Sequence, residues 1–333
     1  MAITGHSSRD ACPGALQVHQ AADGPLARVR LPGGDLTGAQ LAVLATAGGG
    51  VLELTSRANI QVRGVDDPAG FAEAIAAAGL LPSASHERVR NIVASPLSGS
   101  AAFRALVKGL DEAICAVPEL ADLSGRFLFA VDDGSGDVAG LGADVVLMSR
   151  GEHFAVFAGT TDLSLRLPPT EAIHAAVHVA QTFLRLSEGE WRIPEGTFPG
   201  PKATFPEPRT SGYVGDFGAM TGALVPLGRL TAAQALVLAE AEWLRITPWR
   251  TLLVPAGTRL PEGLITDPGS PWLHVTACTG SPGCAKSLSD VQADARPIGV
   301  PVHWSGCARR CGRPRGEVTD LIATPSGYQR SAS

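Results

Sequence analysis

Four cysteines near the C-terminal end of the chain have a spacing that suits a metal centre. Cys278 and Cys284 are separated by five residues, and Cys307 and Cys311 by three. Soft metals prefer thiolate ligands, so four thiolates that converge on one point would hold an iron–sulfur cluster or zinc. The first loop is rich in glycine, which lets the backbone bend tightly around a bulky group. We expect these four residues to bind a [4Fe–4S] cluster.

Zinc and disulfide bonds are the two alternatives for these cysteines. Structural zinc sites usually have about two to four residues between paired ligands, and the first spacing here is longer. Disulfides need an oxidising compartment. The sequence begins without an apolar leader segment, so we expect a cytoplasmic protein with reduced thiols. Cys12 and Cys115 are expected to be structural bystanders.

The elements that must position these residues include an internal repeat. Residues 36–45 and 230–239 are identical at seven of ten positions, and matching apolar segments follow at 52–55 and 244–247. This pattern predicts a duplicated strand–helix–strand–strand module with a pseudo-two-fold axis. Asp35 or Thr37 should cap the first helix. The second copy has Trp249 in place of Arg57, followed by Arg250, so the copies are equal in structure and unequal in chemistry.

Several further elements follow from periodicity. We expect a helix at 287–295, a strand followed by a turn at 125–134, and one helical turn between Cys307 and Cys311. Arg88 and Arg90 alternate on a predicted strand and should share a face. Turn chemistry is the simplest role for the Asp-Asp-Gly sequence at 132–134.

Composition limits the class of protein. The chain has 333 residues, 45% of them hydrophobic and 18% charged, which indicates a globular protein of two or three domains. The net charge of −5 argues against a nucleic-acid partner. No apolar run is long enough for a transmembrane helix, so we expect no membrane partner.

The cysteine pattern resembles the cluster motif of the sulfite and nitrite reductase haemoprotein superfamily. Within it, residues 277–290 and 305–314 resemble the precorrin-3B synthase family. The resemblance implies an α+β fold: duplicated ferredoxin-like half-domains with pseudo-two-fold symmetry, plus sirohaem/Fe–S-type α+β domains. The expected boundaries are a first half-domain at 14–82, a tetrapyrrole-binding catalytic domain at 86–190, a Pro-rich linker at 191–212, a second half-domain at 213–265 and a cluster domain at 270–328.

Three arginines are implied as catalytic residues by the same resemblance. The sequence T-x-R-x-N-I-Q-x-R-G at 55–64 resembles the strand pair whose arginine faces the tetrapyrrole, which would make Arg57 the active-site cation. Arg90 resembles a second arginine that lines the tetrapyrrole. Arg126 and Leu128 occupy the places of two lysines that sulfite reductases typically carry. The loss of one cation argues against sulfite reduction. A solvated loop is the alternative setting for Arg57.

The resemblance implies an oxidoreductase of the monooxygenase type. Its substrates would be dioxygen and precorrin-3A, which is hydroxylated with γ-lactone formation in aerobic cobalamin biosynthesis. A further non-haem iron would accompany the [4Fe–4S] cluster. Because no G-x-G-x-x-G follows a predicted strand, electrons should come from an external NADH-dependent reductase or a ferredoxin. The arginines at 309, 310, 313 and 315 would form either a solvated face or a docking site for a polycarboxylate.

Two other functions remain open from the sequence. The first is a sirohaem-dependent sulfite or nitrite reductase, in which Cys311 would also bridge to the sirohaem iron, as the last cluster cysteine does in relatives. The second is a zinc-stabilised interaction protein without enzymatic activity.

Overall fold

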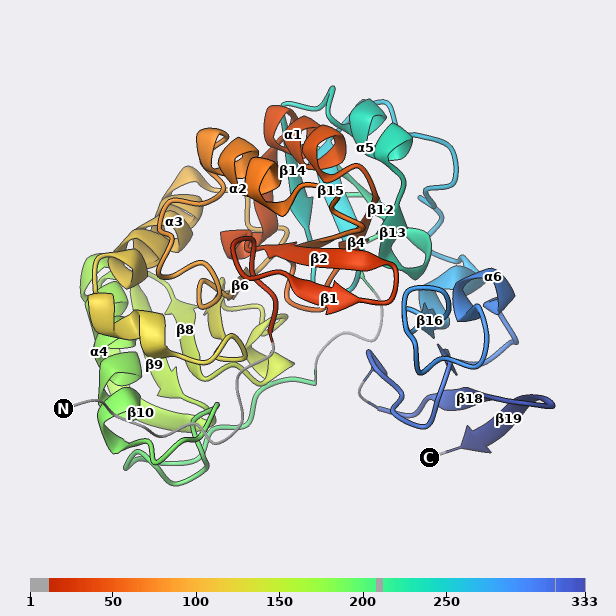
Figure 1. The fold of residues 1–333 in the computed structure, drawn as a ribbon. Helices are drawn as coiled ribbons and strands as arrows, with labels where there is room; N and C mark the ends of the chain where they lie inside the picture. The colour runs from red at the N-terminus through yellow and green to blue at the C-terminus, as the bar shows by residue number, and fades with distance from the viewer. Residues whose placement is uncertain (1–11, 208–211, 315, 333) are drawn as a thin grey trace.

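The fold consists of four β-sheets and the helices that cover them. A computed structural model describes residues 12–207, 212–314 and 316–332 (Figure 1). Two of the sheets form a central body, and the other two form modules on opposite sides of it. We call these the first module, residues 92–186, and the second module, residues 275–332.

The central body is built from the two predicted half-domains. The first sheet has the order β1-β2-β5-β4-β13 and the second has the order β11-β12-β15-β14-β3. The strands of the first half-domain are β1 (His19–Ala21), β2 (Gly24–Val29), β3 (Asp35–Thr37), β4 (Val51–Leu54) and β5 (Ile60–Arg63). Those of the second are β11 (Gly215–Asp216), β12 (Met220–Leu224), β13 (Arg229–Leu230), β14 (Trp243–Ile246) and β15 (Thr251–Pro255).

Each half-domain gives one strand to the sheet of the other. Strand β3 pairs with β14, and β13 pairs with β4. Helices α1 (Gly38–Gly48), α2 (Pro68–Ala77) and α5 (Ala232–Leu238) cover the paired sheets (Figure 1). One apolar core runs through both half-domains, from Ala15 to Val254, so the two repeats fold as one unit.

The repeated helices begin in the same way. Thr37 caps α1 and Thr231 caps α5, and each threonine accepts a hydrogen bond from the amide three residues later. Gln40 and Gln234 return a hydrogen bond to the amide of their own cap, which completes a capping box in both copies. Thr37, and not Asp35, is therefore the cap.

Asp35 instead belongs to a pair of reciprocal ion pairs. Its Oδ1 accepts from Arg245 Nε at 2.6 Å, between β3 and β14. At the equivalent place between β13 and β4, Arg229 Nε lies 3.6 Å from Glu53 Oε1. In each contact the two residues lie directly opposite each other on neighbouring strands. The exchanged strand carries the acid in β3 and the base in β13. Charge complementarity thus supports both strand exchanges, with the carboxylate in the first copy each time.

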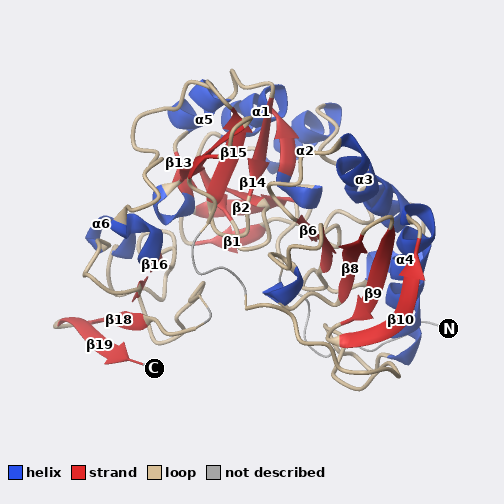
Figure 2. Cartoon of the chain, turned by 180° about the vertical axis from the view of Figure 1, so that it is seen from behind, coloured by secondary structure: helices blue, strands red, loops and turns tan. Residues whose placement is uncertain are grey.

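The first module is a five-stranded sheet with two helices on one face. Its order is β10-β9-β8-β7-β6, and β6, β7 and β8 are parallel. Figure 2 shows α3 and α4 together on the outer face of this sheet, where they share its larger core. The bounds are β6 (Ile92–Ala94), α3 (Ala101–Cys115), β7 (Phe129–Asp132), β8 (Val145–Arg150), β9 (His153–Ala158), β10 (Thr161–Leu167) and α4 (Pro169–Leu186).

The second module repeats the topology of the first. Its strands β16, β17 and β18 are parallel, and β19 is antiparallel to β18, as β9 is to β8. The bounds are β16 (Val275–Ala277), α6 (Val291–Asp294), β17 (Val302–Ser305), β18 (Thr319–Thr324) and β19 (Gly327–Ala332). The duplication therefore extends beyond the half-domains, although the sequence comparison found it only there.

Several predicted elements differ in the structure. The helix predicted at 287–295 is reduced to the four residues of α6, because the loop at 287–290 turns back to hydrogen-bond Gly306 and Ser281. Strand β7 begins only at Phe129. Residues 85–89 form turns, so Arg88 and Arg90 do not share a strand face. Consecutive turns, and not a helix, join Cys307 to Cys311.

We predict that Asp35→Asn lowers the free energy of unfolding by about 1–3 kcal/mol, measured by urea denaturation. The substitution leaves the buried Arg245 without its carboxylate and also removes the contact of Arg104 at 3.3 Å. Asp66→Asn is the control, since Asp66 is exposed, and it should change the unfolding free energy by less than about 0.5 kcal/mol. Equal stabilities for both variants would contradict this role of the strand exchange.

Candidate functional site

A cavity of about 640 Å³ lies where the central body meets both modules. Its wall contains two of the four predicted cluster ligands, Cys278 and Cys311, and it also contains Cys12. Cys12, which was expected to be a structural bystander, thus lies beside the same space as two predicted ligands. Five arginines line the cavity: Arg28, Arg57, Arg126, Arg192 and Arg250. Glu53 is the one acidic residue in its lining among the described residues.

The parallel pairing of β16 and β17 brings the two cysteine loops together. Cys278 follows β16 and Cys307 follows two residues after β17, and the carboxyl ends of parallel neighbours meet at one sheet edge. The amide of Cys278 donates to Trp304 O at 2.9 Å, which fixes the start of the first loop. The amide of Gly306 donates to Cys278 Sγ at 3.2 Å. Such amide–sulfur bonds stabilise a thiolate.

The remaining two cysteines lie close to these. Burial raises the pKa of Cys311, and the nearby thiols of Cys278, Cys307 and Cys284 raise it further. The four predicted ligands therefore come together, although 22 residues separate the two pairs in the chain. Cys311 is exposed and the other three are half-buried, and both Cys311 and Cys278 line the cavity.

The described cysteines are not grouped as tightly as the ligands of a bound zinc ion. Zinc–sulfur bonds of about 2.3 Å place the four sulfurs of a zinc site about 3.8 Å apart. Among the described residues, three metal-ligating side chains lie within 4.8 Å of one another only at Asp132, Asp133 and Asp137, so no three cysteine sulfurs are that close. Within the part of the chain that the structure describes, these cysteines therefore do not form a preformed zinc site.

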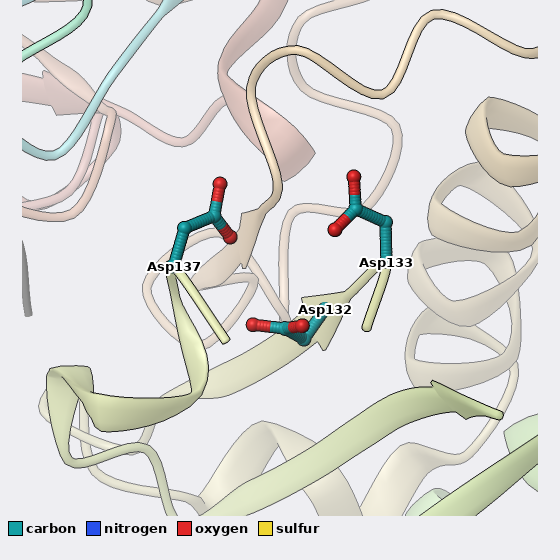
Figure 3. A group of neighbouring side chains, drawn as sticks. All are labelled: Asp132, Asp133 and Asp137. Carbon is teal, nitrogen blue, oxygen red and sulfur yellow. The ribbon is translucent and has the colours of Figure 1, made fainter. Parts of the chain in front are cut away.

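Asp132, Asp133 and Asp137 lie close together just after the end of β7 in the first module (Figure 3). The cysteine loops follow the equivalent strands of the second module. Ser95 follows β6 as Cys278 follows β16, and the amide of Asp133 donates to Ser95 Oγ at 3.0 Å. The Asp132 carboxylate accepts four backbone amides, including Gly134, which confirms the predicted turn chemistry. Asp137 accepts from Ser95 and from Tyr213. The carboxylate oxygens of Asp132 and Asp137 thus already accept hydrogen bonds within the protein, which argues against a metal site here.

Arg57 lines the cavity and also joins the central body to the first module. Its guanidinium donates to Gly125 O and Arg126 O, both at 2.9 Å. Burial and, to a smaller extent, the nearby charge of Arg192 together lower the pKa of Arg57 to about 10. The side chain remains a cation at neutral pH, and it is held rigidly rather than solvated in a loop.

Of the other two predicted arginines, Arg126 lines the cavity and Arg90 does not. Arg126 lines the cavity, and its guanidinium lies 4.1 Å from the centre of the Trp191 ring. Residue 128 is a buried leucine just before β7, so this segment brings no second cation to the cavity. Arg90 is also buried, and its two-pronged ion pair with Asp111 points it at α3. The prediction that Arg90 lines the site is therefore not supported, because its partner on α3 turns it away from the cavity.

Three of the five cavity arginines were not among the predicted site residues. Arg28 lies on β2 and donates to Gln61 Oε1 at 3.0 Å. Arg192 donates to the buried Asp144 at 2.6 Å, so the predicted linker forms part of the cavity wall. Arg250 follows Trp249 in the second repeat. The one sequence feature that could have identified Arg250 is the repeat, because the equivalent turn of the first copy contains Arg57.

The arginines beside the second cysteine pair have a structural role. Arg310 and Arg313 both donate to the buried Asp320 Oδ2, at 3.0 Å. Both arginines are thus paired with a carboxylate of the protein itself, which argues against the predicted docking site for a carboxylate ligand at these two residues. Their ion pairs tie the Cys307–Cys311 loop to β18. Arg315 lies outside the described residues.

The fold defined by these elements is that of the nitrite and sulfite reductases. The family model "Nitrite/Sulfite reductase ferredoxin-like half domain" matches residues 19–69. The solved structure of the Mycobacterium tuberculosis NirA protein superposes with a TM-score of 0.67 at 18% identity, over 92% of this chain and 73% of that one. The predicted fold class is thereby confirmed.

Two relatives extend the similarity to nearly the whole chain. A precorrin-3B synthase of a Sinorhizobium species is 26% identical, over 96% of this chain and 82% of its own length. A ferredoxin–nitrite reductase of Synechococcus elongatus is 24% identical, over 89% of this chain and 75% of its own length. These findings confirm the resemblance to precorrin-3B synthase and to its superfamily. None of the helices in the described parts of the chain has the length and apolarity to span a membrane.

We predict that Asp320→Asn exposes the second cysteine loop. Without its carboxylate, Arg310 and Arg313 lose a charged partner, and the cost of about 1–3 kcal/mol raises the local opening of the loop roughly fivefold to a hundredfold. Trypsin cleavage of the native protein within residues 309–314 should accelerate by that factor. Asp267→Asn, which alters an exposed turn, is the control. An unchanged cleavage rate would show that the ion pairs do not hold the loop.

Proposed function

We propose that this protein is an oxygenase of the precorrin-3B synthase type. It would hydroxylate precorrin-3A with dioxygen and close a γ-lactone in aerobic cobalamin biosynthesis. The observation that carries the proposal is the cavity itself, which joins five arginines to two members of a four-cysteine site. The relative named precorrin-3B synthase supports the choice of reaction.

The charge of the cavity favours a polyanionic ligand. Five guanidinium groups face one carboxylate, although the chain as a whole has a net charge of −5. Glu53 is already neutralised, since Arg63 and Arg229 lie 3.5 and 3.6 Å from its oxygens. A tetrapyrrole with carboxylate side chains offers the matching charges, and arginine binds carboxylates with paired hydrogen bonds. A volume of about 640 Å³ is in the range of cofactor-sized sites.

The cysteine site is proposed to hold a [4Fe–4S] cluster through Cys278, Cys284, Cys307 and Cys311. When bound, such a cluster supplies electrons singly for the reductive activation of dioxygen. The protein's own residues orient the ligand: Arg57 and Arg126 form part of a rigid wall at the first module. Gln292 donates to Cys278 O at 2.6 Å and leaves a buried Oε1 without a partner in the described chain, available to a ligand N–H.

The proposed reaction needs an external source of electrons. One oxygen atom enters the macrocycle and the other leaves as water, so two electrons and two protons must be supplied. We propose an NADH-dependent reductase or a ferredoxin as the donor, and a further non-haem iron as the second metal. The name of the second relative is consistent with a ferredoxin partner.

A sirohaem-dependent nitrite or sulfite reductase is the second candidate. The position of Cys311 favours it, because an exposed thiol on the cavity wall could bridge to a sirohaem iron. The buried Leu128 argues against it, since a small oxyanion would lack the second cation of that strand. A sirohaem absorption band in protein purified without oxygen would favour the reductase.

We predict that Cys284→Ser abolishes cluster binding. A serine hydroxyl is a poor ligand for iron in place of a thiolate. Iron and acid-labile sulfide, measured after anaerobic reconstitution, should fall to background. Cys115→Ser is the matched control, because Cys115 lies on α3 outside the cavity. Wild-type iron and sulfide content in Cys284→Ser would remove Cys284 from the ligand set.

The proposed activity is tested with reconstituted protein, precorrin-3A, a reductant and isotopically labelled dioxygen. We expect the mass of the product to show one labelled oxygen atom incorporated. Reduction of sulfite or nitrite with no oxygenated tetrapyrrole would establish the second candidate instead. A protein that contains zinc and neither iron nor sulfide would support the non-enzymatic alternative.

A further inference from the structure

Arg250 is distinguished from the other cavity arginines because its guanidinium has no partner among the residues that the structure describes. Arg28, Arg57 and Arg192 each donate a hydrogen bond to a protein oxygen, and Arg126 lies against the Trp191 ring. For the Arg250 guanidinium, no hydrogen bond or ion pair occurs within the described ranges. Burial lowers the pKa of Arg250, and the one nearby charge that raises it is Glu53. Because Arg63 and Arg229 already neutralise Glu53, the positive charge of Arg250 is in excess.

The backbone holds Arg250 in an unusual conformation. Its φ angle is +60°, in the left-handed region that residues other than glycine rarely adopt. The equivalent residue of the first repeat, Ala58, has a φ of +56°. Matching turns explain both values, since the amides of Ala58 and Arg250 donate to Thr55 O and Thr247 O respectively. The duplicated turn therefore fixes the direction of this side chain, and only the second copy carries a charge there.

The surroundings leave room for this side chain and place its end beside the cysteine site. A Cβ at Gly228 would lie 2.6 Å from Arg250 Cδ, so only glycine accommodates the stem. A Cβ at Gly312 would lie 3.3 Å from Arg250 Nη2. Gly312 directly follows Cys311. The guanidinium therefore lies next to the second cysteine loop, whereas Arg57 and Arg126 lie at the first module.

We propose that Arg250 binds a carboxylate of the cavity's ligand on the cysteine side, and so determines which edge of a polycarboxylate macrocycle lies beside Cys311. The inference rests on the proposed function and adds an orientation to it. A macrocycle held only by the arginines near the first module could bind with several edges toward the cysteines. A single cation on the cysteine side selects an edge that carries a carboxylate at that place.

The test measures binding of two porphyrin probes to the cluster-loaded protein by fluorescence titration. Uroporphyrin carries an acetate and a propionate on every pyrrole ring, and coproporphyrin has methyl groups in place of the acetates. We expect Arg250→Ala to weaken binding of uroporphyrin roughly tenfold to a hundredfold, as expected for a lost charge-assisted hydrogen bond. A similar loss with coproporphyrin assigns the contact to a propionate, and a loss with uroporphyrin alone assigns it to an acetate.

Three further variants separate binding from structure. Arg250→Lys should recover part of the affinity, because it keeps the charge and loses the two-pronged geometry. Arg250→Gly should bind as weakly as Arg250→Ala while adopting the positive φ without strain. The turn should survive Arg250→Ala, since Ala58 adopts the same conformation. Arg259→Ala is the control, because Arg259 is exposed and outside the cavity.

The two hypotheses fail in different ways. If the wild-type protein binds either probe and Arg250→Ala binds both as tightly, the role of Arg250 is wrong and the proposed function stands. If the wild-type protein binds neither probe and leaves precorrin-3A unchanged, the proposed function is wrong and this inference falls with it.

Discussion

The exchange of β3 and β13 between the half-domains is the constraint on which the rest of the structure depends. Each exchanged strand is short, yet each is held by a capped helix behind it and an ion pair beside it. Separating the half-domains would break both ion pairs and expose their common core. Because the exchange is symmetric, the turn after β4 and the turn after β14 both contribute to one cavity, through Arg57 and Arg250.

The same duplication shapes the two modules, which use one backbone arrangement for different chemistry. In each module, the residue after the second parallel strand donates its amide to the side chain of the residue after the first parallel strand. The amide of Gly306 donates to Cys278 Sγ, and the amide of Asp133 donates to Ser95 Oγ. In the first module the equivalent loop is closed by hydrogen bonds to the carboxylates of Asp132 and Asp137. In the second, the thiols remain available, as a cluster site requires. The strand topology provides the location, and the side chains decide its use.

The cavity concentrates positive charge in an acidic protein. Fixed cations bind an anion without reorganising, and a partly dry site weakens the screening of their charge. Arg57 and Arg192 are held by oxygen atoms of the first module, so their positions are set before any ligand arrives. Arg250 differs, since the turn fixes its backbone while its guanidinium remains without a partner in the described chain.

The sequence alone determined the duplicated half-domains and reduced the cap of the first helix to Asp35 or Thr37, because these depend on spacing and local hydrogen bonds within a few residues. The spacing of Leu36 to Ala45 and its copy was sufficient to predict one strand–helix unit twice. Short motifs also identified Arg57 and Arg126, which line the cavity. The topology of the second module escaped sequence comparison, since parallel pairing joins strands that are far apart and share no residue pattern.

Only the tertiary structure decided which charges face the cavity. Arg90 was among the predicted site residues and Arg250 was not, but in the structure Arg250 lines the cavity and Arg90 does not. Arg90 forms an ion pair with Asp111 on α3. Arg250 lies in a turn with a positive φ angle, and Gly228 and Gly312 leave room for its side chain beside the second cysteine loop. The direction of a charged side chain depends on the partner that another element brings to it, and that partner exists only once the chain has folded.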